Sequence, residues 1–136
     1  MKTLTSVLAV LFLGGLILNV ESFGAGTSDS TQSVSGGGVT VKVTYLNPKS
    51  SEPPRFSAAL DTHSVNLDSY ELKSLAFLRD EAGKVYRPTA VENKGSGHHR
   101  EVVLTFPRIS GAAKRMELVI KDVAGVKERT FRWDLQ

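Results

Sequence analysis

Short segments in which apolar and polar residues alternate at every second position constrain the fold of this chain more than any other feature. The clearest is VTVKVTY at 39–45, where valines and a tyrosine alternate with threonines and a lysine. This period of two predicts a β-strand with one buried face, because neighbouring side chains on a strand point to opposite sides of the sheet. RFSAALD at 55–61 repeats the pattern with a phenylalanine, an alanine and a leucine. We therefore expect two strands of the same kind, separated by a proline-rich connection.

Three alternating segments in the second half predict further strands: EVVLTFP at 101–107, MELVIKD at 116–122 and TFRWDL at 130–135. The segment YELKSLAFLRDEAGKVYRP at 70–88 is ambiguous, since its leucines also fit one face of a helix. We predict a strand, a hairpin turn at Gly83 and a second strand there, with a short helical turn near 69–73 as the alternative. Pro88 restricts the second arm to a sheet edge or to its own end.

About seven short strands separated by turn residues predict an all-β fold, an antiparallel sandwich of immunoglobulin-like or cupredoxin-like type. The 136-residue sequence contains no cysteine, so the domain depends on its core rather than on disulfides. The predicted domain covers 39–136, a length at which domains commonly fold alone. We expect Phe131 and Trp133 to cap its core.

The segment 1–22 reads as an export signal. A single lysine, Lys2, precedes an apolar run that extends from about Val7 to Val20. A short basic start and an apolar middle are typical of a secretory signal peptide, here with cleavage after Ser22 or after Gly24. The alternative is an uncleaved membrane anchor, because Leu4 to Val20, with the weaker Thr5 and Ser6 near its start, just reaches the roughly 17 residues that a short span requires. Either interpretation places the folded domain outside the cytoplasm, in the periplasm or the extracellular space.

Residues 23–38 read FGAGTSDSTQSVSGGG and are almost all small or polar. Such a segment buries too little apolar surface to offset the entropy lost on ordering, so it is predicted to be a flexible linker. The predicted organisation is therefore an export segment or anchor, a linker and one β-sandwich domain.

The formal net charge of +3 does not arise from a basic patch. Basic residues are scattered along the chain among acidic ones, which is typical of a mixed, solvated surface. The densest pair, Lys114 and Arg115, is too short to indicate a nucleic-acid site. We expect no nucleic-acid partner and instead a protein partner at the membrane or cell surface, with membrane contact through 1–22 if that segment is retained.

All three histidines lie in polar segments beside predicted strands. His98 and His99 follow Gly-Ser-Gly, and His63 lies in LDTHSVNLD together with Asp61. Loops gather at the two ends of a sandwich, so these four side chains are predicted to meet and to bind copper or zinc through imidazole and carboxylate groups. The alternative is that the histidines are turn residues, either solvated or hydrogen-bonded to the backbone.

The same polar segment supports a second metal hypothesis, in which Asp61, Asn66 and Asp68 bind calcium through oxygen ligands. Their order is not that of an EF-hand loop, and hydrogen bonding of Asp and Asn within turns explains the same residues more simply. The sequence contains no Gly-x-Ser-x-Gly, no His-Glu-x-x-His and no phosphate-binding glycine loop. We therefore expect a protein that is not an enzyme.

The segments FSAALDTHSVNLDSYELKSLAFLRDEAGKVYRP and GSGHHREVVLTFP carry a resemblance that runs from about Val39 to Trp133. In them the chain resembles small exported prokaryotic β-sandwich proteins, a family without an established activity. The resemblance implies the fold and the exported location and assigns no functional residue. In size and export the chain is also similar to small periplasmic copper-binding sandwiches, but it lacks their methionine-rich segments and a histidine near the mature start.

Two functions remain open from the sequence. The first is an exported or tethered accessory protein that binds a partner or ligand, with copper or zinc held by the histidines and Asp61. The second is a structural or interaction subunit of a membrane complex or a cell-surface assembly that binds no metal.

Overall fold

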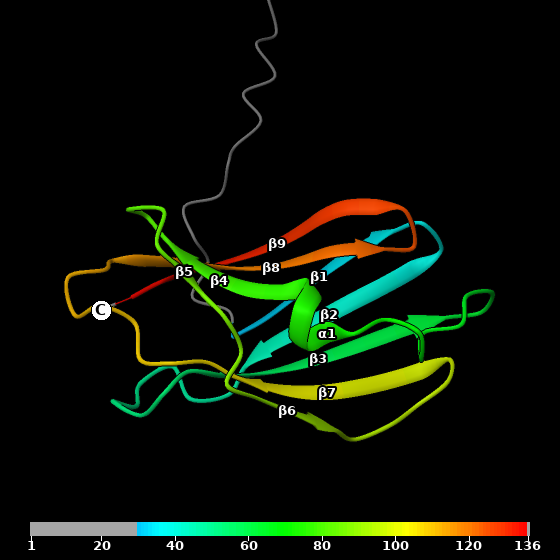
Figure 1. Ribbon diagram of the computed structural model, residues 1–136, viewed down its shortest axis with the longest axis horizontal. Coiled ribbons are helices and arrows are strands. Elements are labelled where there is room, and N and C mark those ends of the chain that lie inside the picture. The colour runs from blue at the N-terminus through cyan, green and yellow to red at the C-terminus, as the bar shows by residue number, and fades with distance from the viewer. Residues whose placement is uncertain (1–29, 136) are drawn as a thin grey trace, which may run out of the picture.

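The computed structural model describes residues 30–135, which form two β-sheets packed face to face (Figure 1). This part of the chain contains nine strands and one short helix. In chain order they are β1 (Thr31–Gly36), β2 (Val39–Tyr45), β3 (Arg55–Thr62), α1 (Leu72–Leu75), β4 (Ala76–Asp80), β5 (Val85–Tyr86), β6 (Ala90–Asn93), β7 (His99–Thr105), β8 (Arg115–Val123) and β9 (Val126–Asp134). The export segment predicted at 1–22 lies outside the described residues. Within them, no helix is long and apolar enough to cross a membrane.

Both sheets are antiparallel throughout. One has five strands in the order β1-β2-β3-β7-β6, and the other has four strands in the order β5-β4-β8-β9. β3 therefore pairs with β7, a strand far along the chain, while β4 and β5 belong to the opposite sheet. This arrangement confirms the predicted all-β antiparallel sandwich, with nine strands in place of about seven.

The core lies between the sheets and is formed by the inward face of each alternating segment. The three valines of β2 are at most 1% exposed, and so are Met116, Leu118 and Ile120 of β8. Phe131 and Trp133 are buried from β9, as the sequence predicts. Aromatic rings pack against one another at one end of this core, and they belong to Tyr45, Phe56, Phe106 and Trp133.

Residues 31–36 form a strand, so the flexible linker predicted over 23–38 is wrong for this part of it, while 23–29 lie outside the described residues. β1 is polar because it is the edge of the five-stranded sheet and buries little surface. Its order comes from backbone pairing with β2 along its whole length. Hydroxyl groups add to this pairing on the outer face, where Thr31 bonds to Thr44 at 2.9 Å.

The side chain of Gln32 bridges β1 and β9. Its amide nitrogen donates to the backbone oxygen of Arg132 at 2.5 Å, and its amide oxygen accepts from the backbone nitrogen of Arg132 at 3.0 Å. These two bonds satisfy backbone groups at the edge of β9. This side of the sandwich is therefore covered, as exposed strand edges in native proteins usually are.

The ambiguous segment at 70–88 contains both kinds of structure. Leu72–Leu75 form one turn of helix, which corrects the strand predicted for this part and agrees with the helical alternative. The hairpin that follows is confirmed, with Gly83 at a φ of 82°. β5 is a two-residue edge strand that ends before Pro88, as predicted. β6 is not predicted by the sequence pattern, because only Val91 among its four residues is a large apolar side chain.

The two ends of the sandwich carry different loops (Figure 1). The loops 46–54 and 106–114 gather with Leu135 at one end, which we call the pocket end. The loop after β3, the loop before β7 and the turns of the β1–β2 and β8–β9 hairpins gather at the other end, which we call the histidine end. The predicted metal ligands belong to the histidine end.

A row of charged side chains crosses the outer face of the four-stranded sheet. Arg79 of β4 and Arg132 of β9 both donate to the carboxylate of Glu117 on β8, each at 2.7 Å. Burial raises the pKa of Glu117, but the hydrogen bonds from the two arginines outweigh it and hold the pKa below its ordinary value of 4.5. Because the folded-state pKa is depressed, this stabilisation is present above the unfolded pKa and is lost as the pH falls through the folded value.

We expect Glu117→Gln to lower the free energy of unfolding by about 1 kcal/mol at neutral pH. The loss disappears at an acidic pH below the folded-state pKa, where the native side chain is itself protonated. Urea unfolding at the two pH values checks this, with Glu101→Gln as the control because Glu101 accepts a hydrogen bond from Ser57 on the other sheet. An equal loss in both variants, or a loss that persists at low pH, contradicts the assignment.

Candidate functional site

The histidine site predicted from the sequence is only partly assembled. Asp61 of β3 and His99 of β7 lie opposite one another in the antiparallel ladder, and Asp61 Oδ1 is 2.5 Å from His99 Nδ1. The side chains are 51% and 75% exposed, respectively. The contact therefore joins two surface groups whose charge pairing is weakened by solvent.

The other two histidines do not complete a metal site with this pair. The side chains of His63 and His98 are exposed. Within residues 30–135, no group of three or more acidic or imidazole side chains is positioned to hold a metal ion. The backbone of His98 has a structural role, because its carbonyl oxygen accepts a hydrogen bond from the Thr62 nitrogen at 3.1 Å. Of the four predicted ligands, the structure brings together Asp61 and His99.

The segment LDTHSVNLD is a packed loop with Thr62 at its centre. Thr62 is 4% exposed, and its hydroxyl donates to the Gly38 carbonyl at 2.8 Å. The same oxygen accepts from the backbone nitrogens of Ser64 and Val65, both at 3.2 Å. Leu67 is fully buried in the core. The polar composition of this segment is therefore explained by how the chain turns away from β3.

The other polar residues of this loop bond to neighbouring segments. Asp68 Oδ1 accepts from the backbone nitrogen of Gly97 at 2.9 Å, which ties the loop to the Gly-Ser-Gly turn before the histidines. Asn66 Oδ1 accepts from the Asp68 nitrogen at 3.0 Å, and the buried Arg100 donates to two carbonyls of the loop. Asp61, Asn66 and Asp68 thus have three different partners, which gives no support to the calcium hypothesis.

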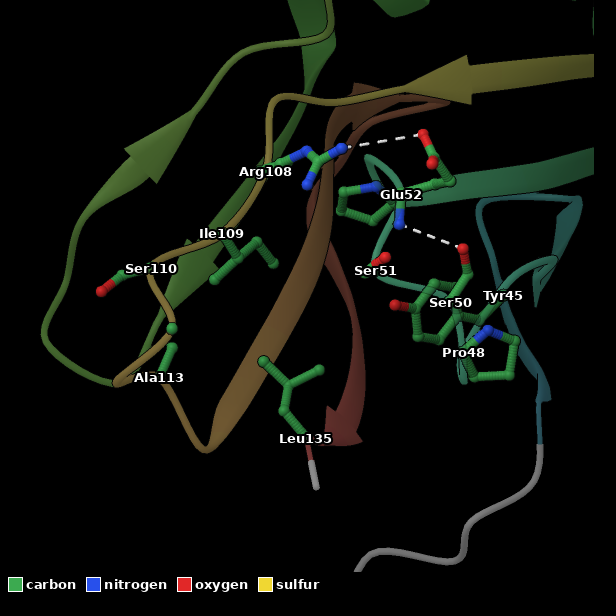
Figure 2. Close-up of a pocket in the computed structure, with 12 residues that line it drawn as sticks. Tyr45, Pro48, Ser50, Ser51, Glu52, Arg108, Ile109, Ser110, Ala113 and Leu135 are labelled. Atoms are coloured by element: carbon green, nitrogen blue, oxygen red, sulfur yellow. Dashed lines mark hydrogen bonds and ion pairs between the residues drawn. The ribbon is translucent and has the colours of Figure 1, made fainter.

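The pocket end contains a cavity of about 340 Å³ that the sequence analysis missed (Figure 2). Its walls come from the loop 46–54, the loop 106–114 and the residue after β9. The side chains of Tyr45, Ile109 and Leu135 point toward the common space. Cavities of about 300 to 1,000 Å³ are usual for small-molecule or side-chain recognition, so this one has room for a ligand of modest size.

The first wall of the cavity is a loop that is closed by Asn47. The side-chain nitrogen of Asn47 donates to the Pro53 carbonyl at 3.0 Å, and its side-chain oxygen accepts from the Arg55 nitrogen at 2.9 Å. Ser50 Oγ accepts from the backbone nitrogen of Glu52 at 3.0 Å (Figure 2). Three prolines fix φ within the same loop. These features hold the wall in one conformation.

The second wall is tied to the β4–β5 hairpin and to the end of β9. The backbone nitrogen of Ser110 donates to the hydroxyl of Tyr86 at 3.2 Å, and that hydroxyl donates to the buried carboxylate of Asp80 at 3.1 Å. The Leu135 nitrogen donates to the Lys114 carbonyl at 2.7 Å. Both walls are therefore held in place by hydrogen bonds to other parts of the domain, which leaves their inner surfaces free to contact a ligand.

The floor of the cavity contains an unpaired polar group. Tyr45 is 8% exposed, and its hydroxyl has no hydrogen-bond partner among residues 30–135 although it faces the cavity. Burial raises the pKa of Tyr45, so the hydroxyl is a neutral donor at physiological pH. The Trp133 ring lies beside it, with ring centroids 5.9 Å apart. The chain's one tryptophan is therefore a spectroscopic reporter for this cavity.

The mouth of the cavity carries one charge of each sign. Arg108 Nη2 and Glu52 Oε2 are 3.8 Å apart, and their side chains are 64% and 71% exposed (Figure 2). At this distance and exposure the pair is weak, and both side chains can rotate toward a ligand at little cost.

Two other hollows help to define the site. One of about 390 Å³ adjoins the cavity and shares Ser50 and Glu52 with it, and the exposed Leu46 is part of its lining. The other, of about 600 Å³, is open and is lined by four charged residues of the β8–β9 hairpin alone. The pocket end is thus the better candidate, because several segments build it and it combines apolar and polar groups.

Sequence reasoning missed the cavity because its residues come from distant segments, none of which carries a known motif. The available signal was indirect: Tyr45 ends one strand, and the connection after it contains three of the five prolines of the chain. Comparison of the chain with protein-family models, with curated proteins and with solved structures finds no match. The geometry of the site is therefore the basis for proposing a function.

Proposed function

We propose that this protein is an exported or membrane-tethered accessory domain, not an enzyme, that binds a protein partner at its pocket end. The hydroxyl of Tyr45 carries the proposal, because it lines a cavity of mixed polar and apolar character and makes no hydrogen bond within residues 30–135. Because the hydroxyl lies at the cavity surface, a ligand can reach it without breaking a hydrogen bond within the described residues. A ligand that fills the cavity and offers an acceptor satisfies it.

The position of the chain entry supports an interaction at this end. Ser30, the first described residue, accepts a hydrogen bond from the backbone nitrogen of Tyr45 at 2.7 Å. The preceding residues, which include the export segment or anchor predicted at 1–22, are therefore joined to the domain beside the cavity. If the anchor is retained, a partner at the cavity lies close to the membrane, which favours the subunit of a membrane complex over a freely diffusing binder.

The size of the native assembly tests the proposal. We expect the wild-type chain, extracted from the producing cells in mild detergent, to elute from a sizing column well above the monomer. Ile109→Asp places a carboxylate in the half-buried apolar wall and is expected to release the monomer. His98→Asp is the control, because it adds the same charge at the opposite end. An assembly that survives Ile109→Asp, or a wild-type chain that elutes as a monomer, overturns the proposal.

A second candidate function is the binding of copper or zinc at the histidine end, favoured by the contact between Asp61 and His99. Two ligands on adjacent strands form part of a site, and the candidate requires the exposed His63 or His98 to supply a third ligand. Titration with Cu(II) and Zn(II) tests this candidate. It requires binding tighter than millimolar that is lost in His99→Ala. Binding that is weaker, or that is unchanged when all three histidines are replaced by alanine, eliminates it.

A further inference from the structure

We infer that the cavity at the pocket end binds an extended peptide segment of the partner, with two apolar side chains placed two residues apart. This inference rests on the proposed function and names the chemistry of the partner. It is carried by the Tyr45 hydroxyl in the cavity lining, by the charges at the mouth and by the arrangement of the two adjoining hollows.

The shape of the site fits an extended chain better than a single small molecule. The cavity over Tyr45 and the hollow beside Leu46 share Ser50 and Glu52, so they lie next to each other along the loop 46–54. Alternate side chains of an extended peptide lie on the same face, roughly 7 Å apart. One apolar side chain of the peptide therefore enters the cavity between Ile109 and Leu135. The apolar side chain two residues further on lies on the same face and reaches the exposed Leu46.

The charges at the mouth select a neutral ligand. Glu52 and Arg108 lie 3.8 Å apart there, and their formal charges sum to zero. An anion such as phosphate gains Arg108 but meets the carboxylate of Glu52, and a cation meets the opposite conflict. A peptide backbone carries no net charge and offers both donors and acceptors, so it can bond to both side chains. Its carbonyl groups also offer an acceptor to the Tyr45 hydroxyl in the cavity lining.

The single tryptophan permits a direct binding test with the full-length chain in mild detergent. Trp133 packs against the ring of Tyr45, so its fluorescence is expected to change when the cavity fills. The probes are acetylated and amidated Leu-Gly-Leu, the same peptide with aspartate in place of both leucines, N-acetylleucinamide, and inorganic phosphate. We expect saturable binding of the leucine peptide, and binding at least tenfold weaker for each of the other three probes.

Two variants connect the fluorescence change to the cavity. Tyr45→Phe removes one oxygen and keeps the ring, and we expect it to weaken binding of the leucine peptide about fivefold, in line with a neutral hydrogen bond. His98→Ala, at the opposite end, is the control and leaves binding unchanged. Equal binding of N-acetylleucinamide and the peptide indicates a small-molecule site and overturns the inference. Preference for the aspartate peptide or phosphate, or an unchanged affinity in Tyr45→Phe, also overturns it.

Failure of the peptide inference can be told apart from failure of the proposed function. If Ile109→Asp releases the native assembly but no peptide binds, the partner is recognised by other chemistry, and the peptide inference is wrong while the proposed function stands. If the assembly is unaffected by Ile109→Asp, the proposed function fails whatever the peptides do.

Discussion

Replacing Gly37 by alanine is expected to lower the free energy of unfolding by about 3 to 4 kcal/mol, one of the two largest effects that we predict for a single substitution. Gly37 has a φ of 61°, and a Cβ at this position would lie 2.2 Å from the carbonyl oxygen of Ala124. That oxygen belongs to the turn of the β8–β9 hairpin, in which Ala124 itself has a φ of 53°. The two hairpin turns are therefore in contact, and a methyl group on Gly37 requires one of them to move.

Gly83→Ala is the matched control for this prediction. Gly83 has a φ of 82° in a hairpin turn of its own, but a Cβ there meets no atom within 4 Å. We expect Gly83→Ala to lose only the energy of placing a Cβ at positive φ, about 1 to 2 kcal/mol. Urea unfolding followed by tryptophan fluorescence measures both. Similar losses in the two variants would show that the contact between the turns is unimportant.

Replacing Arg129 by alanine is expected to cost about 3 to 5 kcal/mol, because it leaves a cavity and removes the guanidinium donor from two carbonyls. Arg129 is 1% exposed, and its guanidinium donates to the carbonyl oxygens of Gly36 at 2.6 Å and of Val123 at 2.8 Å. It therefore joins the turn of the β1–β2 hairpin to that of the β8–β9 hairpin. Burial lowers the pKa of Arg129, which means that burial disfavours the charged form of the side chain. The hydrogen bonds to the two carbonyls must more than offset this desolvation cost.

Two further variants separate these contributions. Arg129→Met fills most of the volume and removes the buried charge, so its loss reports the two hydrogen bonds from the guanidinium and is expected to be about 2 kcal/mol. Arg132→Ala removes an arginine from the same strand whose side chain is 68% exposed, and we expect a loss below about 1 kcal/mol. Losses of equal size for Arg129→Ala and Arg132→Ala would contradict a role for Arg129 in joining the hairpins.

The fold was predictable wherever one face of a strand is apolar. β2, β3, β7, β8 and β9 were all found from the alternation of valine, leucine and aromatic residues, since burial of one face imposes the period of two. β1 was missed because an edge strand needs no apolar face: its order depends on pairing with β2 and on bonds from Gln32. The Gly-Gly pair after it, both with positive φ, fits a two-residue hairpin turn as well as a linker.

The candidate site was less predictable than the fold. Two segments stand out in the sequence, LDTHSVNLD and GHHR. In the structure they lie together at the histidine end, and the hydrogen bonds of Thr62 and Asp68 there are made to the backbone. Register places Asp61 opposite His99, which the sequence suggested only as a meeting of loops. The cavity depends on where the side chains of Ile109 and Leu135 meet that of Tyr45, a property of tertiary packing that no local pattern encodes.

The central claim is that the pocket end, rather than the histidine end, contacts the partner. A photoreactive amino acid placed at position 109 or at position 98 of the full-length chain, in the producing cells, tests this claim most directly. We expect irradiation to yield one defined protein adduct from position 109, suppressed by Leu135→Asp in the same chain, and no adduct of that size from position 98. An adduct from position 98 alone, or adducts of equal yield from both positions, would contradict the account.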